Sequence, residues 1–324
     1  RHFDHVVQGG SVIKPLQGLG EVNGTASVTR PVLDSKKAAV ISQGINPRYS
    51  DIDTYAMAAA SLDDAIAAAV AVGGDLNTMA IMDNFCWCSS DEAQRLGELK
   101  AAGEACYDIA VAYETPYISG KDSMFNDFKG FDENNNPVKI SIPPTVLGSA
   151  ISVIPDASKA NSMDFKNEGD LVYELGETKS ELGASEYYAH HGYIGNKVAL
   201  VDTASARERY ENIFKGSQAD LFHSVIHIDK GGLAVAFAKS AIAGQKGAVI
   251  SLRDDLRNDE LLFSETKSRF LVSIHPRRKE EFETLFPNAR ELGEVKGDRI
   301  QIGTLVDLSV KEATTAYHST FAKH

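Results

Sequence analysis

The fold of this chain is decided by two apolar segments with polar ends, Thr78-Met79-Ala80-Ile81-Met82-Asp83-Asn84-Phe85-Cys86-Trp87 and Pro116-Tyr117-Ile118-Ser119-Gly120-Lys121-Asp122-Ser123. Each segment is typical of a strand, and apolar residues at helical spacing lie between them. The two strand ends offer carboxylates, a glycine that lets a ligand approach the backbone, and a lysine. Such a set suits a phosphate group bound through magnesium. The stretch therefore predicts a binding site as well as a strand, helix, strand unit.

Flanking segments extend this unit into a layered fold. Residues 38–42 form the clearest strand candidate ahead of it. An alanine-rich helix is expected to begin near Asp53 and to stop at the Gly-Gly pair at 73–74. Ser90 is expected to cap a second helix that runs to about Glu114. This order of helix, strand, helix and strand predicts an α/β or α+β fold.

The remaining chain predicts a second set of strands and helices. Residues 130–137 are typical of a hairpin loop, and a strand is expected at 146–154. A domain boundary is expected within 155–168, where polar residues replace the apolar alternation. This gives an N-terminal domain over 1–160 and a C-terminal domain over 161–324. In the C-terminal domain, strands are expected at 170–175, 224–228, 248–252, 270–274 and around 299–305, and helices at 181–190, 204–214, 232–243 and 277–285.

Composition and charge exclude several classes of function. The 324 residues are 43% hydrophobic and carry a formal net charge of -12, which argues against general binding to nucleic acid or to anionic membranes. No run approaches the roughly 20 apolar residues of a membrane span, and residues 1–5 lack the apolar core of a signal peptide. The cysteines Cys86, Cys88 and Cys106 fit structural thiols in a reducing compartment better than disulfides or zinc ligands. A soluble cytoplasmic protein is expected.

Two further segments are weaker candidates for a site. Asp229, Gly231 and Gly232 lie between a strand and a helix, where the glycines either present backbone N–H groups to an anion or form a structural turn. Glu265 and Arg269 either contact a polar ligand or pair with each other at the surface. The chain contains no P-loop and no Gly-x-Gly-x-x-Gly after a strand, so any ATP site must use another architecture.

Seven short segments carry a family resemblance when they are taken in order: residues 3–10, 83–87, 118–123, 142–145, 182–187, 229–233 and 263–265. Over nearly its whole length the chain resembles the phosphoribosylformylglycinamidine synthase family, which is part of the aminoimidazole ribonucleotide synthetase superfamily. The resemblance implies two related halves. Each half has an N-terminal domain that contributes strands to a shared barrel, followed by a C-terminal α/β domain. This chain resembles the second half and, because it does not begin with methionine, is expected to be a piece of a longer polypeptide.

The resemblance implies a carbon–nitrogen ligase of purine biosynthesis. In this family ATP, Mg2+ and ammonia from glutamine convert formylglycinamide ribonucleotide to formylglycinamidine ribonucleotide. The implied partners are the first synthetase half, in the same or a separate chain, and a glutaminase domain or subunit of the amidotransferase complex. The His-Asn-His-Pro-type segment of the first half, which carries the catalytic histidine, is absent here. We therefore expect no catalytic residue and no synthase activity in this chain alone, and we expect the isolated chain to form a homodimer through exposed strands.

The family motifs also imply roles for individual positions. Asp83 and Gly120 match contacts to ATP, and Ser123 matches a serine assigned to substrate. Smaller family members have Gly-Asn-x-Ser where this chain has Gly120-Lys121-Asp122-Ser123. Asp122 is therefore the expected metal ligand, and Lys121 is an expected ATP phosphate contact. The weaker candidates are Asn84, Asp229, Gly231, Gly232 and Glu265.

Two alternatives remain open at this point. The second half of larger family members can hold an auxiliary nucleotide, which implies that the chain could be a noncatalytic binding and assembly module. Another ATP-dependent phosphotransferase of the superfamily, related to the selenophosphate or thiamine phosphate kinases, is the other alternative. Tight binding of Mg-ATP to the isolated chain would favour the assembly module, whereas weak binding would favour a site completed by another half.

Overall fold

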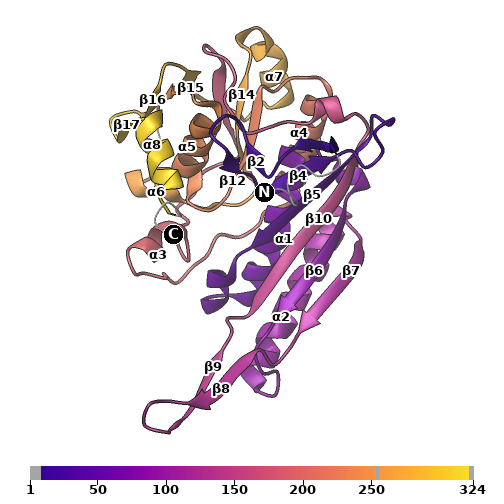
Figure 1. Ribbon diagram of the computed structural model, residues 1–324, viewed down its shortest axis with the longest axis vertical. Coiled ribbons are helices and arrows are strands. Elements are labelled where there is room, and N and C mark those ends of the chain that lie inside the picture. The colour runs from indigo at the N-terminus through magenta and orange to yellow at the C-terminus, as the bar shows by residue number, and fades with distance from the viewer. Residues whose placement is uncertain (1–8, 253–254, 321–324) are drawn as a thin grey trace.

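The computed structural model describes residues 9–252 and 255–320, which form two large β-sheets packed with helices (Figure 1). Across the first sheet the strands are β1 (Ser11–Ile13), β4 (Ala26–Thr29), β5 (Ala38–Ile45), β10 (Thr145–Ile154), β6 (Ala80–Cys86) and β7 (Tyr117–Ser123). β10 is antiparallel to β5 and to β6, whereas β6 and β7 are parallel. The carboxyl ends of β5, β6 and β7 therefore share one edge of the sheet.

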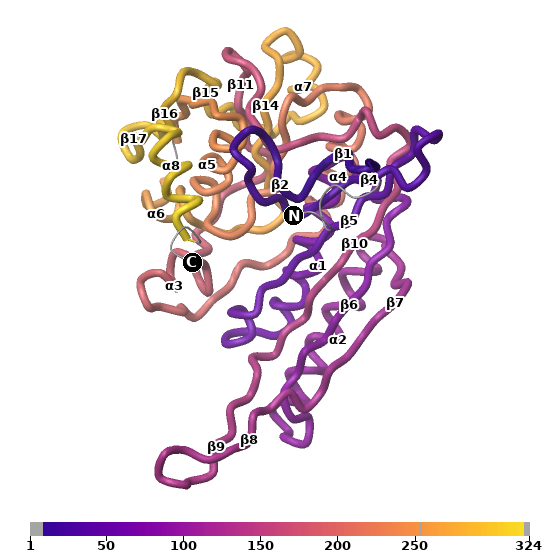
Figure 2. The backbone as a smooth tube through the Cα atoms, viewed as in Figure 1, coloured from indigo at the N-terminus to yellow at the C-terminus, as the bar shows by residue number. Residues whose placement is uncertain are grey.

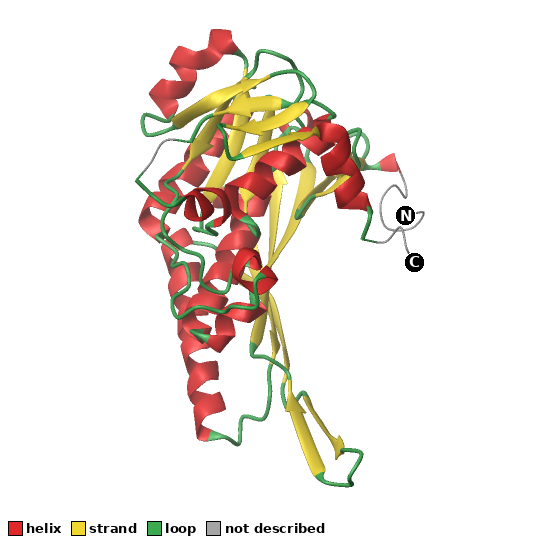
Figure 3. Cartoon of the chain, turned by 90° about the vertical axis from the view of Figure 1, so that its left-hand side faces the viewer, coloured by secondary structure: helices red, strands yellow, loops and turns green. Residues whose placement is uncertain are grey.

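Helices α1 (Thr54–Ala71) and α2 (Ala93–Tyr113) cover one face of this sheet (Figure 3). α1 approaches the strands closely because Gly44 and Gly148 lack side chains. A Cβ at Gly44 would lie 2.2 Å from the Ser61 carbonyl oxygen, and a Cβ at Gly148 would lie 2.8 Å from it. The C-terminal part of the chain packs on the other side of α1, so nearly the whole helix is buried.

The opposite face of the first sheet, here called the open face, carries no helix from the described residues (Figure 3). Along β5 the side chains alternate, so that Ala38 and Val40 are buried against the helices and Ile41 points to the open face. Ile41 is 45% exposed, and Val153 of β10 is 43% exposed on the same face. Apolar exposure of this kind is typical of a surface that another protein covers.

A two-stranded hairpin between β7 and β10 projects from the body of the molecule (Figures 1 and 2). It consists of β8 (Asp127–Phe131) and β9 (Pro137–Ser141). Asp132 closes the turn by accepting hydrogen bonds from two backbone N–H groups. The hairpin confirms the loop predicted at 130–137.

The second sheet lies in the C-terminal half. Its order is β12 (Ser224–Ile228), β14 (Arg269–Ile274), β11 (Leu171–Leu175), β15 (Arg290–Val295), β13 (Ala248–Ile250), β16 (Arg299–Ile302) and β17 (Val306–Ser309). The helices of this half are α3 (Glu186–His190), α4 (Thr203–Gln218), α5 (Gly232–Gly244), α6 (Asn258–Phe263), α7 (Lys279–Leu285) and α8 (Val310–His318). One hydrophobic core extends from α1 to α4, and a second core surrounds α5.

A short hairpin near the start of the chain packs on the C-terminal half (Figure 2). It comprises β2 (Leu16–Gln17) and β3 (Val22–Asn23), and Val22 is buried in the core around α5. Gly20 lies so close to α5 that a Cβ there would be 2.1 Å from the Ile242 carbonyl oxygen. This hairpin, which belongs to the N-terminal part of the chain, therefore packs against the C-terminal part and connects the two.

Most of the predicted elements are confirmed, with three differences. α2 starts after Glu92 and not after Ser90, which lies in a turn. The helix predicted at 181–190 is reduced to α3, because a hydrogen bond from the Glu181 N–H to Ser264 Oγ holds the start of this segment in a loop. Several short elements were not predicted: β1, β2, β3 and β4 near the start of the chain, and β15, α6 and α8 in the C-terminal part, each shorter than ten residues.

The structure also bears on the expected absence of a membrane span, on the three cysteines and on the motif at residues 3–10. Within the described ranges, no helix is both long and apolar enough to cross a membrane. The cysteines are free thiols, and those of Cys88 and Cys106 are buried. The motif at residues 3–10 lies outside the described residues except for its last two glycines.

Candidate functional site

The residues predicted to bind nucleotide lie on the neighbouring strands β6 and β7, from the middle of each strand toward its carboxyl end. Strand pairing places Asp83 beside Gly120. The next pair is Asn84 and Lys121. Neighbouring residues of paired strands point to the same face of a sheet. The structure therefore brings the predicted residues together on β6 and β7 but distributes them over the two faces of the sheet.

Asp83 lies on the face that the helices cover, directly over Gly120. A Cβ at Gly120 would be 2.4 Å from Asp83 Oδ1, so any other residue there would displace the carboxylate. Burial raises the pKa of Asp83, the backbone N–H of Lys121 acts against this rise, and the charge of Asp122 adds to it. Asp83 and Asp122 thus lie on one face, near enough to interact electrostatically.

The open face of the same edge carries Asn84, Lys121 and Ser123. Lys121 Nζ donates a hydrogen bond to Ser123 Oγ. Asn84 Oδ1 is buried and has no hydrogen-bond partner among the described residues. Lys121 and Asp122 are neighbours in sequence, but the alternation of the strand directs them to opposite faces. A ligand on the open face would therefore meet Lys121, whereas Asp83 and Asp122 lie on the opposite face of the sheet.

A complete metal site is not assembled in this chain. Within residues 9–252 and 255–320, no group of three or more His, Cys, Asp or Glu side chains is placed to hold a metal ion. Asp83 and Asp122 nevertheless offer suitable donor groups for Mg2+, because this ion is commonly bound through one or two carboxylates together with substrate phosphates and water. The remaining ligands would come from a nucleotide, from water or from another polypeptide.

The weaker candidates form a separate cluster in the C-terminal half. Glu265 accepts hydrogen bonds from the backbone N–H groups of Gly231 and Glu186, each at 2.8 Å. The Gly232 N–H donates to the carbonyl oxygen of Asp229. Both glycines have positive φ, which favours glycine. Because their N–H groups are used inside the protein, this junction is the structural turn and not an anion cradle.

Glu265 and Arg269 do not pair with each other at the surface. Arg269 is 1% exposed, and its Nη1 lies 3.0 Å from Glu174 Oε1. Glu265 is also buried, and burial raises its pKa. It lines a cavity of about 250 Å³ together with Asn46 and Tyr49. The surface-pair interpretation is therefore wrong, since both side chains are held in the interior by other partners.

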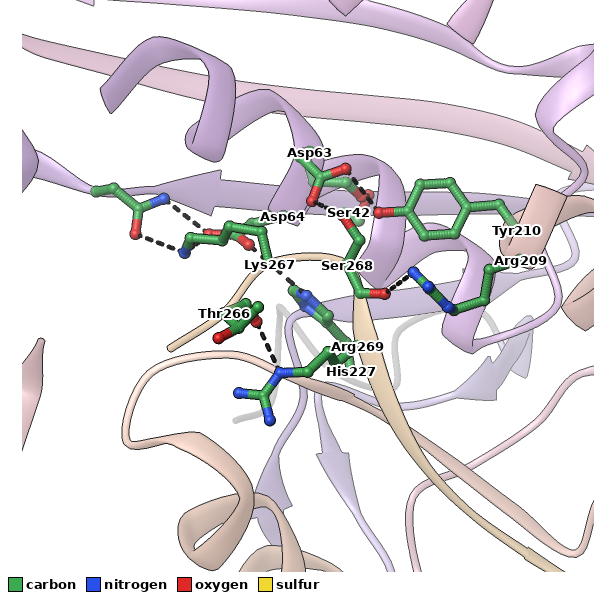
Figure 4. A network of polar contacts seen from close by, with 12 residues as sticks. Ser42, Asp63, Asp64, Arg209, Tyr210, His227, Thr266, Lys267, Ser268 and Arg269 are labelled. Carbon is green, nitrogen blue, oxygen red and sulfur yellow. Dashed lines mark hydrogen bonds and ion pairs between the residues drawn. The ribbon is translucent and has the colours of Figure 1, made fainter. Parts of the chain in front are cut away.

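Beside this cavity, a buried charged network joins the N-terminal part of the chain to its C-terminal part (Figure 4). Asp64 of α1 accepts hydrogen bonds from Lys267 Nζ at 3.0 Å and from Asn46 Nδ2 at 2.7 Å. Burial acts to lower the pKa of Lys267, but Asp64 and other neighbours raise it well above its ordinary value, so the ammonium is retained. The adjacent Asp63 accepts hydrogen bonds from the hydroxyls of Tyr113, Tyr210 and Ser268.

The sequence pattern did not predict this network. Its signal is the pair Asp63 and Asp64 inside an otherwise apolar helix, since a buried carboxylate requires a partner. The pair alone does not identify the partners of Asp64. Its hydrogen-bond partners are Asn46, 18 positions away, and Lys267, 203 positions away, and His227 Nε2 lies 3.6 Å from its other oxygen.

Comparison with known proteins finds relatives over nearly the whole chain. Residues 167–305 match the family described as AIR synthase related protein, C-terminal domain. The phosphoribosylformylglycinamidine synthase subunit PurL of Alkaliphilus metalliredigens is 31% identical over 322 residues, which cover 97% of this chain and 40% of that subunit. The chain is a PurL homologue. PurL of Methanocaldococcus jannaschii is 28% identical over 334 residues, covering 100% of this chain and 44% of that subunit. The chain thus spans less than half the length of these PurL relatives.

Solved structures share the fold. Thermotoga maritima PurL complexed with FGAR aligns with a TM-score of 0.70 at 17% identity, covering 92% of this chain and 49% of that PurL chain. A ThiL protein complexed with AMPPCP and TMP aligns with a TM-score of 0.60 at 12% identity, covering 86% of each chain. The predicted aminoimidazole ribonucleotide synthetase-like fold of this PurL homologue is therefore confirmed.

Proposed function

We propose that the chain is the second synthetase-like half of a phosphoribosylformylglycinamidine synthase and that it completes a nucleotide site only together with a first half. Homology to PurL over nearly the whole chain supports this assignment. The observation that carries it is the position of Asn84, Lys121 and Ser123. These groups lie on the open face, so a ligand there would still need a second wall.

The residues at the strand ends divide the work between the two faces. Asp83 and Asp122 hold Mg2+, which when bound neutralises charge on the ATP phosphates. Lys121 contacts a phosphate oxygen, and Ser123 contacts formylglycinamide ribonucleotide. Gly120 keeps the backbone accessible and leaves room for the Asp83 carboxylate. The chain contributes binding and orientation, while the groups that transfer protons come from the first half.

The open face is the proposed contact surface for the first half. Its exposed apolar side chains, including Ile41 and Val153, are buried when the two halves close a shared barrel. A glutaminase subunit that supplies ammonia is a further proposed partner, and a PurLQS structure of Thermotoga maritima has a similar fold. We place the domain boundary near residue 160 and the enzyme in the cytoplasm.

Calorimetric titration of Mg-ATP into the isolated chain tests this function. A site that needs a first half should bind weakly, and Asp122→Ala should weaken it further. Glu133→Ala is the control, because Glu133 lies in the exposed turn of the hairpin. This variant should bind Mg-ATP as tightly as the wild type does. Tight binding, or nucleotide that copurifies with the isolated chain, would instead support the noncatalytic assembly module.

A further inference from the structure

A second cavity, larger than the one that Glu265 lines, lies in the C-terminal part of the chain. None of its lining residues belongs to the site at β6 and β7. Its volume is about 540 Å³, within the range of small-molecule sites. The walls come from the turn after β11, from α4, and from the connection between α7 and β15. Figure 1 shows α4 and α7 in the upper part of the molecule, far from the projecting hairpin.

Arg209 of α4 provides one cationic wall of this cavity. Its Nη1 donates a hydrogen bond to the Ser268 carbonyl oxygen at 2.7 Å, which fixes the direction of the side chain (Figure 4). Gly176 follows β11 with a φ of +93°, and a Cβ there would be 3.2 Å from Arg209 Cζ. The guanidinium group therefore lies directly against the glycine turn and is held in place on two sides.

Arg290 provides a second guanidinium group at the start of β15. Its Nη2 pairs with Glu174 Oε2, while Arg269 pairs with the other oxygen of the same carboxylate. Glu174 is fully buried, and half-buried Glu181 is a further acidic neighbour of Arg269. Arg209 adds a third guanidinium group nearby, since Gly176 lies against both Arg209 and Arg269. On this interior side three guanidinium groups thus lie near two carboxylates, although the whole chain is acidic.

The other lining residues suit a small organic molecule. Leu175, Leu285 and Phe286 give the cavity an apolar wall. Glu177 and Glu208 also line it, but both are exposed, so water and salt screen their charges. An anionic group placed toward the arginines would leave its carbon part against the apolar wall.

We propose that this cavity binds a small phosphate ester, with the phosphate between Arg209 and Arg290 and the carbon part on Leu175, Leu285 and Phe286. Guanidinium groups suit phosphate because their planar N–H donors pair with its oxygens. The ester fits better than free phosphate because only an ester uses the apolar wall. This site is independent of the function proposed for the strand ends, so either proposal can fail without the other.

Calorimetry with glycerol 3-phosphate tests the proposal on the whole chain. Wild type should bind it more tightly than inorganic phosphate. Arg209→Gln should weaken binding at least about tenfold, the loss expected for one hydrogen bond to a charged group. The matched control Glu208→Gln, on the same helix and in the same cavity, should bind equally or more tightly. Equal affinity for inorganic phosphate, or full affinity in a folded Arg209→Gln variant, would overturn the proposal.

A measurement on the wild type avoids any dependence on variant folding. In methyl NMR, glycerol 3-phosphate should shift the resonances of Leu175 and Leu285 in a saturable way. The methyl groups of Ile41 and Val153, which lie on the open face, serve as controls and should not move. Unchanged Leu175 and Leu285 resonances at millimolar ligand would contradict the assigned site.

Discussion

Asp83 and Gly120 are partners across β6 and β7, and the Asp83 carboxylate occupies the space that a side chain at position 120 would need. The glycine is therefore required for the position of the carboxylate as well as for access to the backbone. This relationship links a sequence motif on one strand to an acidic residue on another. It makes the strand-end site sensitive to a single methyl group.

Gly120→Ala should displace Asp83 and weaken Mg-ATP binding at least about tenfold, because a Cβ would lie 2.4 Å from Asp83 Oδ1. Binding of Mg-ATP by calorimetry measures this effect. Gly97→Ala is the matched control, since Gly97 lies in α2 and a Cβ there would meet no atom of another element within 4 Å. It should keep nucleotide binding and stabilise the fold by up to about 1 kcal/mol. Equal binding by the two variants would show that Asp83 tolerates displacement.

Asp83→Asn tests the electrostatic cost of this carboxylate. Burial and the charge of Asp122 raise the pKa of Asp83. A carboxyl with a raised folded-state pKa favours folding at low pH, and this contribution is lost as pH rises from the ordinary value through the raised value. Asp83→Asn should therefore be at least as stable as wild type near neutral pH, with its relative advantage disappearing below about pH 4. Urea unfolding at both pH values measures the difference, and a variant that is weakest near neutral pH would contradict it.

Breaking the buried pair of Lys267 and Asp64 should be costly. Lys267→Met leaves the Asp64 carboxylate buried without its cation, for an expected loss of about 3–5 kcal/mol in the free energy of unfolding. The double variant with Asp64→Leu should lose less than the sum of the two single changes. Lys100→Met, which removes an exposed pair with Glu104, should cost no more than about 0.5 kcal/mol. Additive losses would argue against coupling between Lys267 and Asp64.

The open face should drive self-association of the isolated chain. Val153→Lys places a charge on this face and should shift sedimentation toward monomer while leaving the circular dichroism spectrum unchanged. Val111→Lys is the control, because Val111 is 57% exposed on α2, whose helix covers the other face of the sheet. It should leave the oligomeric state unchanged. A wild-type chain that sediments as a monomer at high concentration would contradict the proposed contact surface.

Local patterns predict four of the six strands of the first sheet, β5, β6, β7 and β10, and both of its helices. The apolar segments before Asp83 and Gly120 form adjacent strands, and the alanine-rich stretch after Asp53 forms α1. These features depend on periodicity and on capping, which are local in sequence. Asp53, for example, accepts a hydrogen bond from the Ala56 N–H as the cap of α1.

Long-range packing explains what the sequence pattern missed. Lys267 meets Asp64 only because the C-terminal half packs on α1. Arg269 follows a run of polar residues that is typical of a surface segment. The tertiary structure nevertheless buries it, and there it forms an ion pair with Glu174. Likewise Lys121 and Asp122 form one motif in the sequence, but the two faces of β7 separate them. Such pairings follow from tertiary structure and not from local propensity.

Turnover by the isolated chain tests the central claim most directly. The chain is incubated with formylglycinamide ribonucleotide, ATP, Mg2+ and ammonia, and formation of the amidine product is measured. A second half whose site needs another polypeptide should give no amidine above the uncatalysed background. Robust turnover by this chain alone would contradict the account.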